Sequence, residues 1–155
     1  MRYVTRVLQP GETVVYTTRL HLFLYWRAIL LVIICIILAI SAWYTIDDRN
    51  ISLALAIAAI IFALLGLSSA LRAFIRRATT ELAVTDQRVI YKAGLLARHT
   101  LEMNRGKVES VTVDQTMLGR IFGYGTIIVR STGSTLEPIR DITDPLTFRS
   151  HITTA

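Results

Sequence analysis

The feature that most constrains this chain is a pair of long apolar runs in its first half. Residues 28–46 and 51–71 contain 19 and 21 residues, and neither run holds a charged side chain. At about 1.5 Å of rise per residue, a helix over either run would be roughly 30 Å long, which matches the hydrocarbon core of a bilayer. We therefore predict two transmembrane helices joined by the short loop at residues 47–50.

A buried hairpin and a signal peptide both fit these runs less well. A helical hairpin buried inside a soluble domain is disfavoured because a chain of 155 residues offers little protein to cover two such helices. A cleaved signal peptide is disfavoured because the first run is long, begins only after 27 residues and is followed at once by a second span.

The arginines near the runs predict the orientation of the hairpin. Four precede the first run and three follow the second, whereas the connecting loop carries two aspartates and one arginine. Basic residues close to span ends are retained on the cytoplasmic side, so we expect a multi-pass protein of the inner (plasma) membrane with both termini cytoplasmic. The expected organisation is a cytoplasmic segment (residues 1–27), a transmembrane hairpin (residues 28–77) and a cytoplasmic domain (residues 78–155).

Several side chains of the hairpin have expected roles in the membrane. The aromatic pairs at the two ends of the first span are typical of membrane interfaces: Tyr25 and Trp26, then Trp43 and Tyr44. Small residues spaced by three or four favour close helix packing, either within the hairpin or between copies of the chain: Ser52, Ala56, Ala59, Ala63, Gly66 and Ala70. Neither span holds an ionisable residue, so a transport path is not expected.

Arg72, Arg76 and Arg77 follow the second span, on an expected extension of its helix. Arg72 and Arg76 are one helical turn apart and would share a face. Such a cluster serves as a topological anchor, or it attracts anionic lipid headgroups.

Outside the spans, the pattern changes to alternating strands. Residues 13–21 alternate like a strand that needs a partner sheet, and we expect it to join the C-terminal domain. Further strands are expected at residues 82–85, 88–92, 95–103, 108–115, 126–131 and 135–142, with a helical turn at residues 116–122 and a C-terminal helix from Asp144. The predicted fold class is α+β: a transmembrane hairpin and a small antiparallel sheet or barrel with one C-terminal helix.

This order of elements resembles the bacterial branch of the pleckstrin-homology (PH) family. Three segments carry the likeness: LQPGETVVYTTRLH, LAVTDQRVIYKAGLL and, most specifically, KVESVTVDQTMLGRIFGYGTIIV. The resemblance implies a PH-like fold tethered to the membrane, and it implies no mechanism. Because eukaryotic relatives bind phosphoinositides through a basic pocket, Arg98, Arg105 and Lys107 are the candidate headgroup ligands, although they match no headgroup motif.

No pattern in the chain points to chemistry. The single cysteine and three histidines are not at metal-ligand spacing, and no glycine-rich phosphate loop follows a strand. We therefore expect no enzyme, no cofactor or metal, no nucleic-acid partner and no small-molecule substrate. The expected function is a membrane-anchored interaction or scaffolding module with a protein partner or a second copy of itself. The alternative is a sensor of anionic lipid headgroups.

Overall fold

The computed structural model describes residues 3–95, 99–131, 134–135 and 138–153. The chain forms two compact units. One, which we call the β unit, contains residues 1–23 and 76–155, and the other, the hairpin unit, contains residues 24–75. The hairpin unit is thus an insertion between two parts of the chain that fold together.

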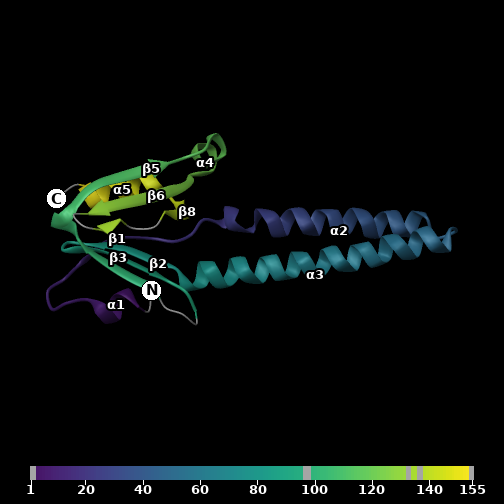
Figure 1. The fold of residues 1–155 in the computed structure, drawn as a ribbon, viewed down its shortest axis with the longest axis horizontal. Coiled ribbons are helices and arrows are strands. Elements are labelled where there is room, and N and C mark those ends of the chain that lie inside the picture. Colours follow the sequence, from purple (N-terminus) through teal and green to yellow (C-terminus); the bar gives the residue numbers. More distant parts are fainter. Residues whose placement is uncertain (1–2, 96–98, 132–133, 136–137, 154–155) are drawn as a thin grey trace. The chain divides into compact units, whose positions relative to one another are not determined.

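The hairpin unit consists of two long helices that lie side by side (Figure 1). A 3-10 turn, η1 (Leu22–Tyr25), leads into α2 (Trp26–Tyr44), and α3 spans Arg49–Thr79, so the predicted helical extension past Leu71 is confirmed. At the tip, the Ser52 hydroxyl donates to the Ala42 carbonyl at 3.0 Å. Both helices are long and apolar enough to cross a membrane, by length and composition alone.

The β unit contains a four-stranded antiparallel sheet, sheet A, in the order β1-β2-β3-β4. The strands are β1 (Val14–Thr18), β2 (Glu81–Thr85), β3 (Arg88–Ala93) and β4 (His99–Asn104). Strand β1 pairs with β2 from Val14 opposite Thr85 to Thr18 opposite Leu82, which places the N-terminal strand in the sheet where we expected it. The strand predicted from Leu95 is shorter than expected: Leu95 lies in a bend and residues 96–98 lie outside the described residues.

A second antiparallel sheet, sheet B, is built around β6. Strand β5 (Val108–Asp114) pairs with one side of β6 (Tyr124–Ser131), and β7 (Ser134–Thr135) and β8 (Ile139–Thr143) pair with the other. The short 3-10 turn η2 (Arg105–Lys107) connects the two sheets. The strand predicted over residues 135–142 is divided into β7 and β8, because Pro138, which lies between them, cannot donate a ladder hydrogen bond.

The C-terminal helix α5 (Pro145–Thr153) closes the β unit, as predicted. Its Phe148 is fully buried, and the ring of Tyr16 in β1 lies 6.2 Å from it. The rest of this core comes from Leu20 and from the inward faces of both sheets, with exposed fractions of 0–1% at Leu20, Leu82, Val84, Val89, Ile127, Val129 and Ile142. Figure 1 shows α5 alongside β5 and β6.

The N-terminal helix α1 (Val4–Val7) explains why β2 is buried on both faces. Val4 packs with Ala83 and Ile90, which face each other across β2 and β3. Because α1 covers this face of sheet A, β2 carries consecutive buried residues instead of the alternation of a half-exposed strand.

The segment between β5 and β6 is a short helix, α4 (Met117–Phe122), at the predicted position. The Thr116 hydroxyl accepts the Gly119 N–H at 3.1 Å and caps its start. Gly123 ends it with φ of 72°, a left-handed conformation that favours glycine. A Cβ at Gly119 would lie 2.6 Å from the Tyr124 carbonyl oxygen, so the turn also needs glycine there.

Candidate functional site

Both chain connections to the hairpin unit leave the same end of the β unit, which we call the proximal end. After β1, Leu20 bridges to Ile142 next to the end of β8, and the Thr143 N–H donates to the Arg19 carbonyl at 3.0 Å. The returning chain arrives beside it, because Arg77 Nε donates to the Leu20 carbonyl at 3.1 Å. This end is therefore fixed by backbone pairing between residues more than a hundred positions apart.

The three arginines of the predicted lipid-binding cluster have different surroundings. Arg77 is half-buried and bound to Leu20, as described above. Arg76 lies 3.7 Å from the Asp141 carboxylate, and its side chain is 49% exposed. Arg72 is exposed and donates to the Ser68 hydroxyl one turn earlier, at 3.4 Å. Arg76 and Arg77 thus belong to the β unit and bind other residues of it, whereas Arg72 belongs to the hairpin unit.

The predicted interface aromatics are mostly exposed. Trp26, Trp43 and Tyr44 are 45%, 75% and 81% exposed, and Tyr25 is half-buried. The Arg27 guanidinium lies over the Trp26 ring, 5.5 Å from its centroid. Phe23, a further aromatic residue near the start of the first span, instead stacks on Tyr124 of β6 with ring centroids 4.3 Å apart.

The small residues of the predicted seam on α3 differ in how far they are buried. Ser52, Ala56 and Ala70 are half-buried, Ala59 and Gly66 are buried, and a Cβ at Gly66 would meet Leu31 and Val32 of α2 at 3.5 Å. Ala63 is exposed. Phe62, the residue before it, is half-buried.

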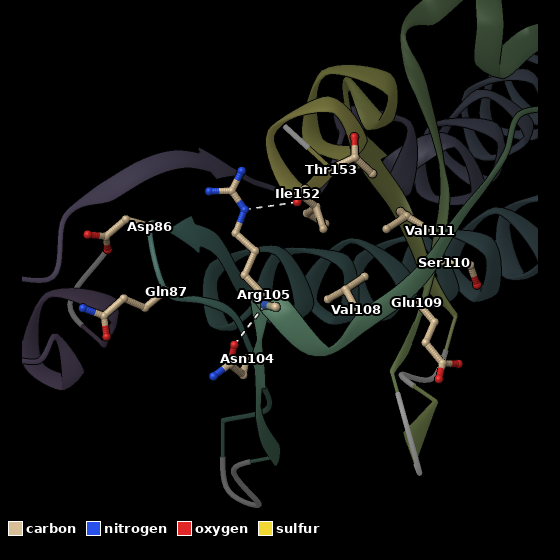
Figure 2. A pocket seen from close by; sticks show the side chains of 11 residues that line it. Asp86, Gln87, Asn104, Arg105, Val108, Glu109, Ser110, Val111, Ile152 and Thr153 are labelled. Carbon is tan, nitrogen blue, oxygen red and sulfur yellow. Dashed lines mark hydrogen bonds between the residues drawn. The ribbon is translucent and has the colours of Figure 1, made fainter. Parts of the chain in front are cut away.

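The opposite, distal end of the β unit carries a groove of about 670 Å³ (Figure 2). The β2–β3 turn, η2, the first half of β5 and the last turn of α5 form its walls. Its lining mixes charged, polar and apolar side chains: Asp86, Gln87, Asn104, Arg105, Val108, Glu109, Ser110, Val111, Ile152 and Thr153. We call this pocket the distal groove.

Of the predicted headgroup ligands, the two that the structure describes, Arg105 and Lys107, do not line one pocket together. Arg105 lines the distal groove, but its Nε donates to the Ile152 carbonyl at 3.1 Å (Figure 2). Ile152 is in the last turn of α5, where carbonyl groups have no partner within the helix and a positive charge is favourable. Lys107 is exposed at the end of η2 and is not among the residues that line the groove. Arg98 lies outside the described residues. Asp86 and Glu109 on the walls make the groove mixed in charge.

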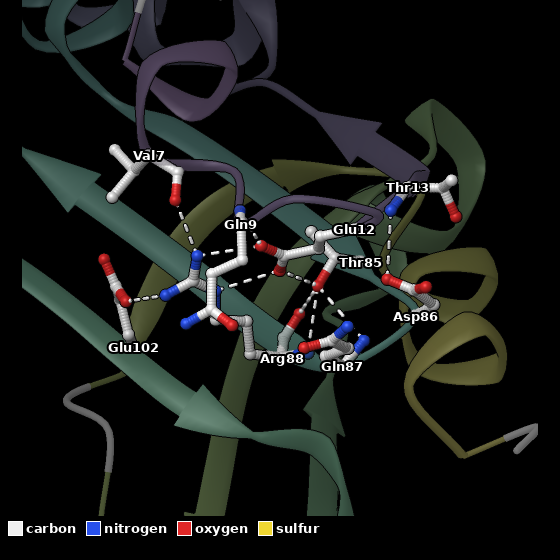
Figure 3. Close-up of polar contacts among 9 residues, drawn as sticks. All are labelled: Val7, Gln9, Glu12, Thr13, Thr85, Asp86, Gln87, Arg88 and Glu102. Carbon is white, nitrogen blue, oxygen red and sulfur yellow. Dashed lines mark hydrogen bonds and ion pairs between the residues drawn. The ribbon is translucent and has the colours of Figure 1, made fainter.

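A buried ion pair that sequence patterns did not reveal ties the N-terminal segment to sheet A (Figure 3). Arg88 binds Glu12 with two hydrogen bonds, from Nε to Oε1 at 2.9 Å and from Nη2 to Oε2 at 2.8 Å. The Thr85 hydroxyl donates to Glu12 Oε1 at 2.6 Å, and the Gln9 N–H donates to Oε2 at 2.8 Å. Arg88 also pairs with Glu102 and donates to the Val7 carbonyl at 2.6 Å.

These contacts change the titration of two carboxyl groups. The hydrogen bonds from Arg88 to Glu12 outweigh the opposing effect of burial and lower its pKa from 4.5 to about 2. Burial acts to raise the pKa of Glu81, but the amides of Val4 and Tyr3 outweigh it and the net pKa is lowered. Both carboxylates hold residues 3–12 in place, and neither opens into the distal groove.

The described residues contain no group of three or more histidine, cysteine, aspartate or glutamate side chains arranged to hold a metal ion. His21 stacks on Tyr124 and His151 on Tyr16, with centroids 5.5 and 4.6 Å apart. Two of the three histidines are therefore part of ring stacks in the β unit.

Comparison with known proteins gives one match. Neither the curated proteins nor the solved structures contain a significant match to the chain. The family model for the bacterial PH domain matches residues 13–155, from the residue before β1 to the end of the chain, and so includes the inserted hairpin. The two antiparallel sheets closed by a C-terminal helix agree with that match. The chain belongs to the bacterial PH domain family.

Proposed function

We propose that this protein is a membrane-anchored interaction module without catalytic activity. The hairpin unit spans the membrane, the β unit lies on the cytoplasmic side with both termini, and the distal groove receives an extended segment of a protein partner. A second copy of the chain is one such partner. No cofactor, nucleic acid or small-molecule substrate is part of the proposal.

The observation that carries this proposal is the position of the hairpin within the β unit. The hairpin is inserted between β1 and β2, so both of its connections leave the proximal end. The distal groove lies at the β2–β3 turn, at the other end of the same strands. An anchor at one end and a groove at the other would leave the groove open to soluble partners.

The edge of β5 suggests what the groove holds. Within the described residues, β5 pairs with β6 on one side and with no strand on the other. Unpaired strand edges accept an extended peptide through backbone hydrogen bonds, and adjacent pockets select its side chains. Val108, Val111 and Ile152 would supply apolar contacts, and the charged walls would supply selectivity.

The alternative function, a sensor of anionic lipid headgroups, has less support. It needs the three arginines after the second span to be available to lipid, but Arg76 is paired with Asp141 and Arg77 with Leu20. Arg72 and Arg76 are both exposed, but Arg76 is already paired with Asp141, and one further arginine attracts anionic lipid by only about 1 kcal/mol.

Site-specific photo-crosslinking in native membranes tests the groove. A photoreactive residue at Ser110, on the groove wall, should give a discrete adduct of higher mass, whose size separates a second copy from another protein. The matched control is Arg140, which is also exposed on a strand but lies outside the groove. Equal crosslinking at both positions, or none at Ser110, would contradict a binding role for the groove.

Cysteine accessibility tests the topology. In a Cys35→Ala background, Asn50→Cys in the hairpin tip should react with a membrane-impermeant maleimide added to intact cells, and Gln87→Cys in the β unit should react only after lysis. Reaction of Gln87→Cys in intact cells would overturn the proposed orientation.

A further inference from the structure

The β unit buries its large apolar side chains except at a few places. Nine are exposed among its described residues, and four of these belong to the single short helix α4. Met117, Leu118, Ile121 and Phe122 are 84%, 52%, 74% and 56% exposed. A turn that only connects β5 to β6 has no need of four exposed apolar residues, because soluble proteins usually place polar residues in such turns.

The turn is also built to hold these side chains outward. Thr116 caps its first turn, Gly119 lies directly under the Tyr124 carbonyl, and Gly123 ends it in a left-handed conformation. Gly119 is the buried residue of α4, so the helix rests on the β unit through a glycine and presents its large side chains away from it. In Figure 1, α4 lies beyond the ends of β5 and β6.

Chain connectivity places α4 close to the start of the first apolar helix. Tyr124, two residues after the end of α4, stacks on Phe23, with ring centroids 4.3 Å apart and an interplanar angle of 15°. Phe23 precedes Trp26, the first residue of α2, by three residues. Three residues of chain span at most about 11 Å, so the Tyr124 end of sheet B cannot lie far from the point where α2 begins.

Three other exposed apolar residues lie at this proximal end. Leu22 lies between β1 and Phe23. Leu95 follows the last residues of β3, which pair with Glu81, the first residue of β2 after the hairpin. Leu146 is the second residue of α5, which begins where the Asp144 N–H donates to the Gly123 carbonyl at 2.9 Å. Seven of the nine exposed apolar side chains are therefore on the proximal end, the end to which the hairpin is connected.

We propose that α4 inserts its apolar side chains into the interfacial layer of the membrane and so forms a third attachment of the β unit, beside the two chain connections. This inference rests on the proposed membrane anchoring. We name a lipid surface as the occupant because of the link between α4 and α2. Tyr124 follows α4 and stacks on Phe23, which comes three residues before an apolar helix long enough to span a membrane. Exposed Arg120 in α4 suits this placement, since its long side chain can reach the phosphates while the apolar side chains enter the lipid.

The test uses the full-length protein reconstituted into phosphatidylethanolamine/phosphatidylglycerol nanodiscs, with and without brominated acyl chains. Ile121→Cys in a Cys35→Ala background carries an environment-sensitive fluorophore, and Leu118→Cys provides a second position on α4. Because both side chains are exposed, neither change disturbs the core. The control is Lys107→Cys, an exposed position at the distal end that does not line the groove.

We expect the α4 probes to show blue-shifted emission, loss of fluorescence in brominated lipid and weaker quenching by aqueous iodide than the Lys107→Cys probe. Iodide quenching equal to that at Lys107→Cys would overturn the inference. Protection from iodide without quenching by brominated lipid would also overturn it, because protein would then cover α4.

The two tryptophans of the chain separate failure of this inference from failure of the anchor. Both lie in the hairpin unit, at Trp26 and Trp43, so brominated lipid should quench their intrinsic fluorescence if the hairpin is in the bilayer. Quenched tryptophans with unquenched α4 probes would reject the attachment by α4 alone. Unquenched tryptophans would reject the membrane anchor and the inference together.

Discussion

The two units of this protein use the same apolar residue types in opposite ways. In the β unit, Ile90 and Ile127 are fully buried, whereas in the hairpin unit Ile33 and Ile60 are 51% and 61% exposed. The sheets, with α1 and α5, provide a core for the first pair, and two helices packed through a narrow stripe provide none for the second. The difference supports the proposal that the hairpin unit lies in a membrane and the β unit outside it.

The largest expected effect comes from the core of the β unit. Phe148→Ala removes a fully buried ring, and we expect it to lower the free energy of unfolding by about 3–5 kcal/mol. Thermal or denaturant unfolding of the full-length protein in detergent measures this loss. Phe122→Ala, the same change at a 56% exposed position, is the matched control and should cost less than about 0.5 kcal/mol. Equal losses would remove the distinction between buried and exposed phenylalanines.

A charge on the outer face of α3 tests the other half of the comparison. Ile60 is near the middle of the second apolar run, and Ile60→Arg should oppose membrane insertion by about 2.5–3.5 kcal/mol. The measurement is the fraction of protein that stays in the membrane pellet after carbonate extraction, with Ile60→Leu as the control. If the arginine variant were instead more soluble and otherwise unchanged, the hairpin unit would be facing water.

The buried Glu12–Arg88 pair gives a prediction about pH. The Glu12 carboxylate has a pKa of about 2 against an ordinary value of 4.5, so its stabilising effect is fully present above pH 4.5 and is lost as the pH falls toward 2. We expect Glu12→Gln to destabilise the β unit by about 2–3 kcal/mol at neutral pH, because Arg88 loses its bidentate partner.

Unfolding of the wild type and the Glu12→Gln variant between pH 7 and pH 3 measures this effect. The gap between the two proteins should shrink as the solution becomes more acidic. A gap that stays constant with pH would show that the charge of Glu12 contributes nothing to folding.

The smallest effect is expected at the ion pair between Arg76 and Asp141. Both side chains are partly exposed, and such pairs contribute less than about 1 kcal/mol. Asp141 has φ of 64°, a conformation that asparagine also tolerates, so Asp141→Asn removes the charge without adding backbone strain. Unfolding measured at low and high salt should show a small loss that disappears in salt. A loss above about 2 kcal/mol would mean that this contact is more than a surface pair.

Much of the fold could be predicted from local patterns. The lengths of the apolar runs predicted α2 and α3, and the pairing of Gly123 with the short run before it predicted α4. The bounds of single strands were less well predicted: the strand expected from Leu95 begins at His99.

The candidate sites were harder to predict, because they depend on residues far apart in the chain. Glu12 and Arg88 are 76 positions apart, and the residues around each of them do not predict which residue it will pair with. Arg77 looked like a surface charge beside the membrane until its bond to Leu20, 57 positions earlier, placed it in the β unit. For Arg105, a candidate headgroup ligand, the sequence did not predict the hydrogen bond to the Ile152 carbonyl of α5, 47 positions later.

The sequence by itself determined that this chain has two uncharged apolar runs of membrane length and a set of alternating strands, because hydrophobic periodicity and charge can be read from neighbouring residues without knowledge of the fold. Tertiary structure decided that the hairpin is an insertion between β1 and β2, that its connections share one end with the apolar side chains of α4, and that the groove lies at the other end. These relations exist only once strands distant in sequence pair, since pairing brings their ends together in space.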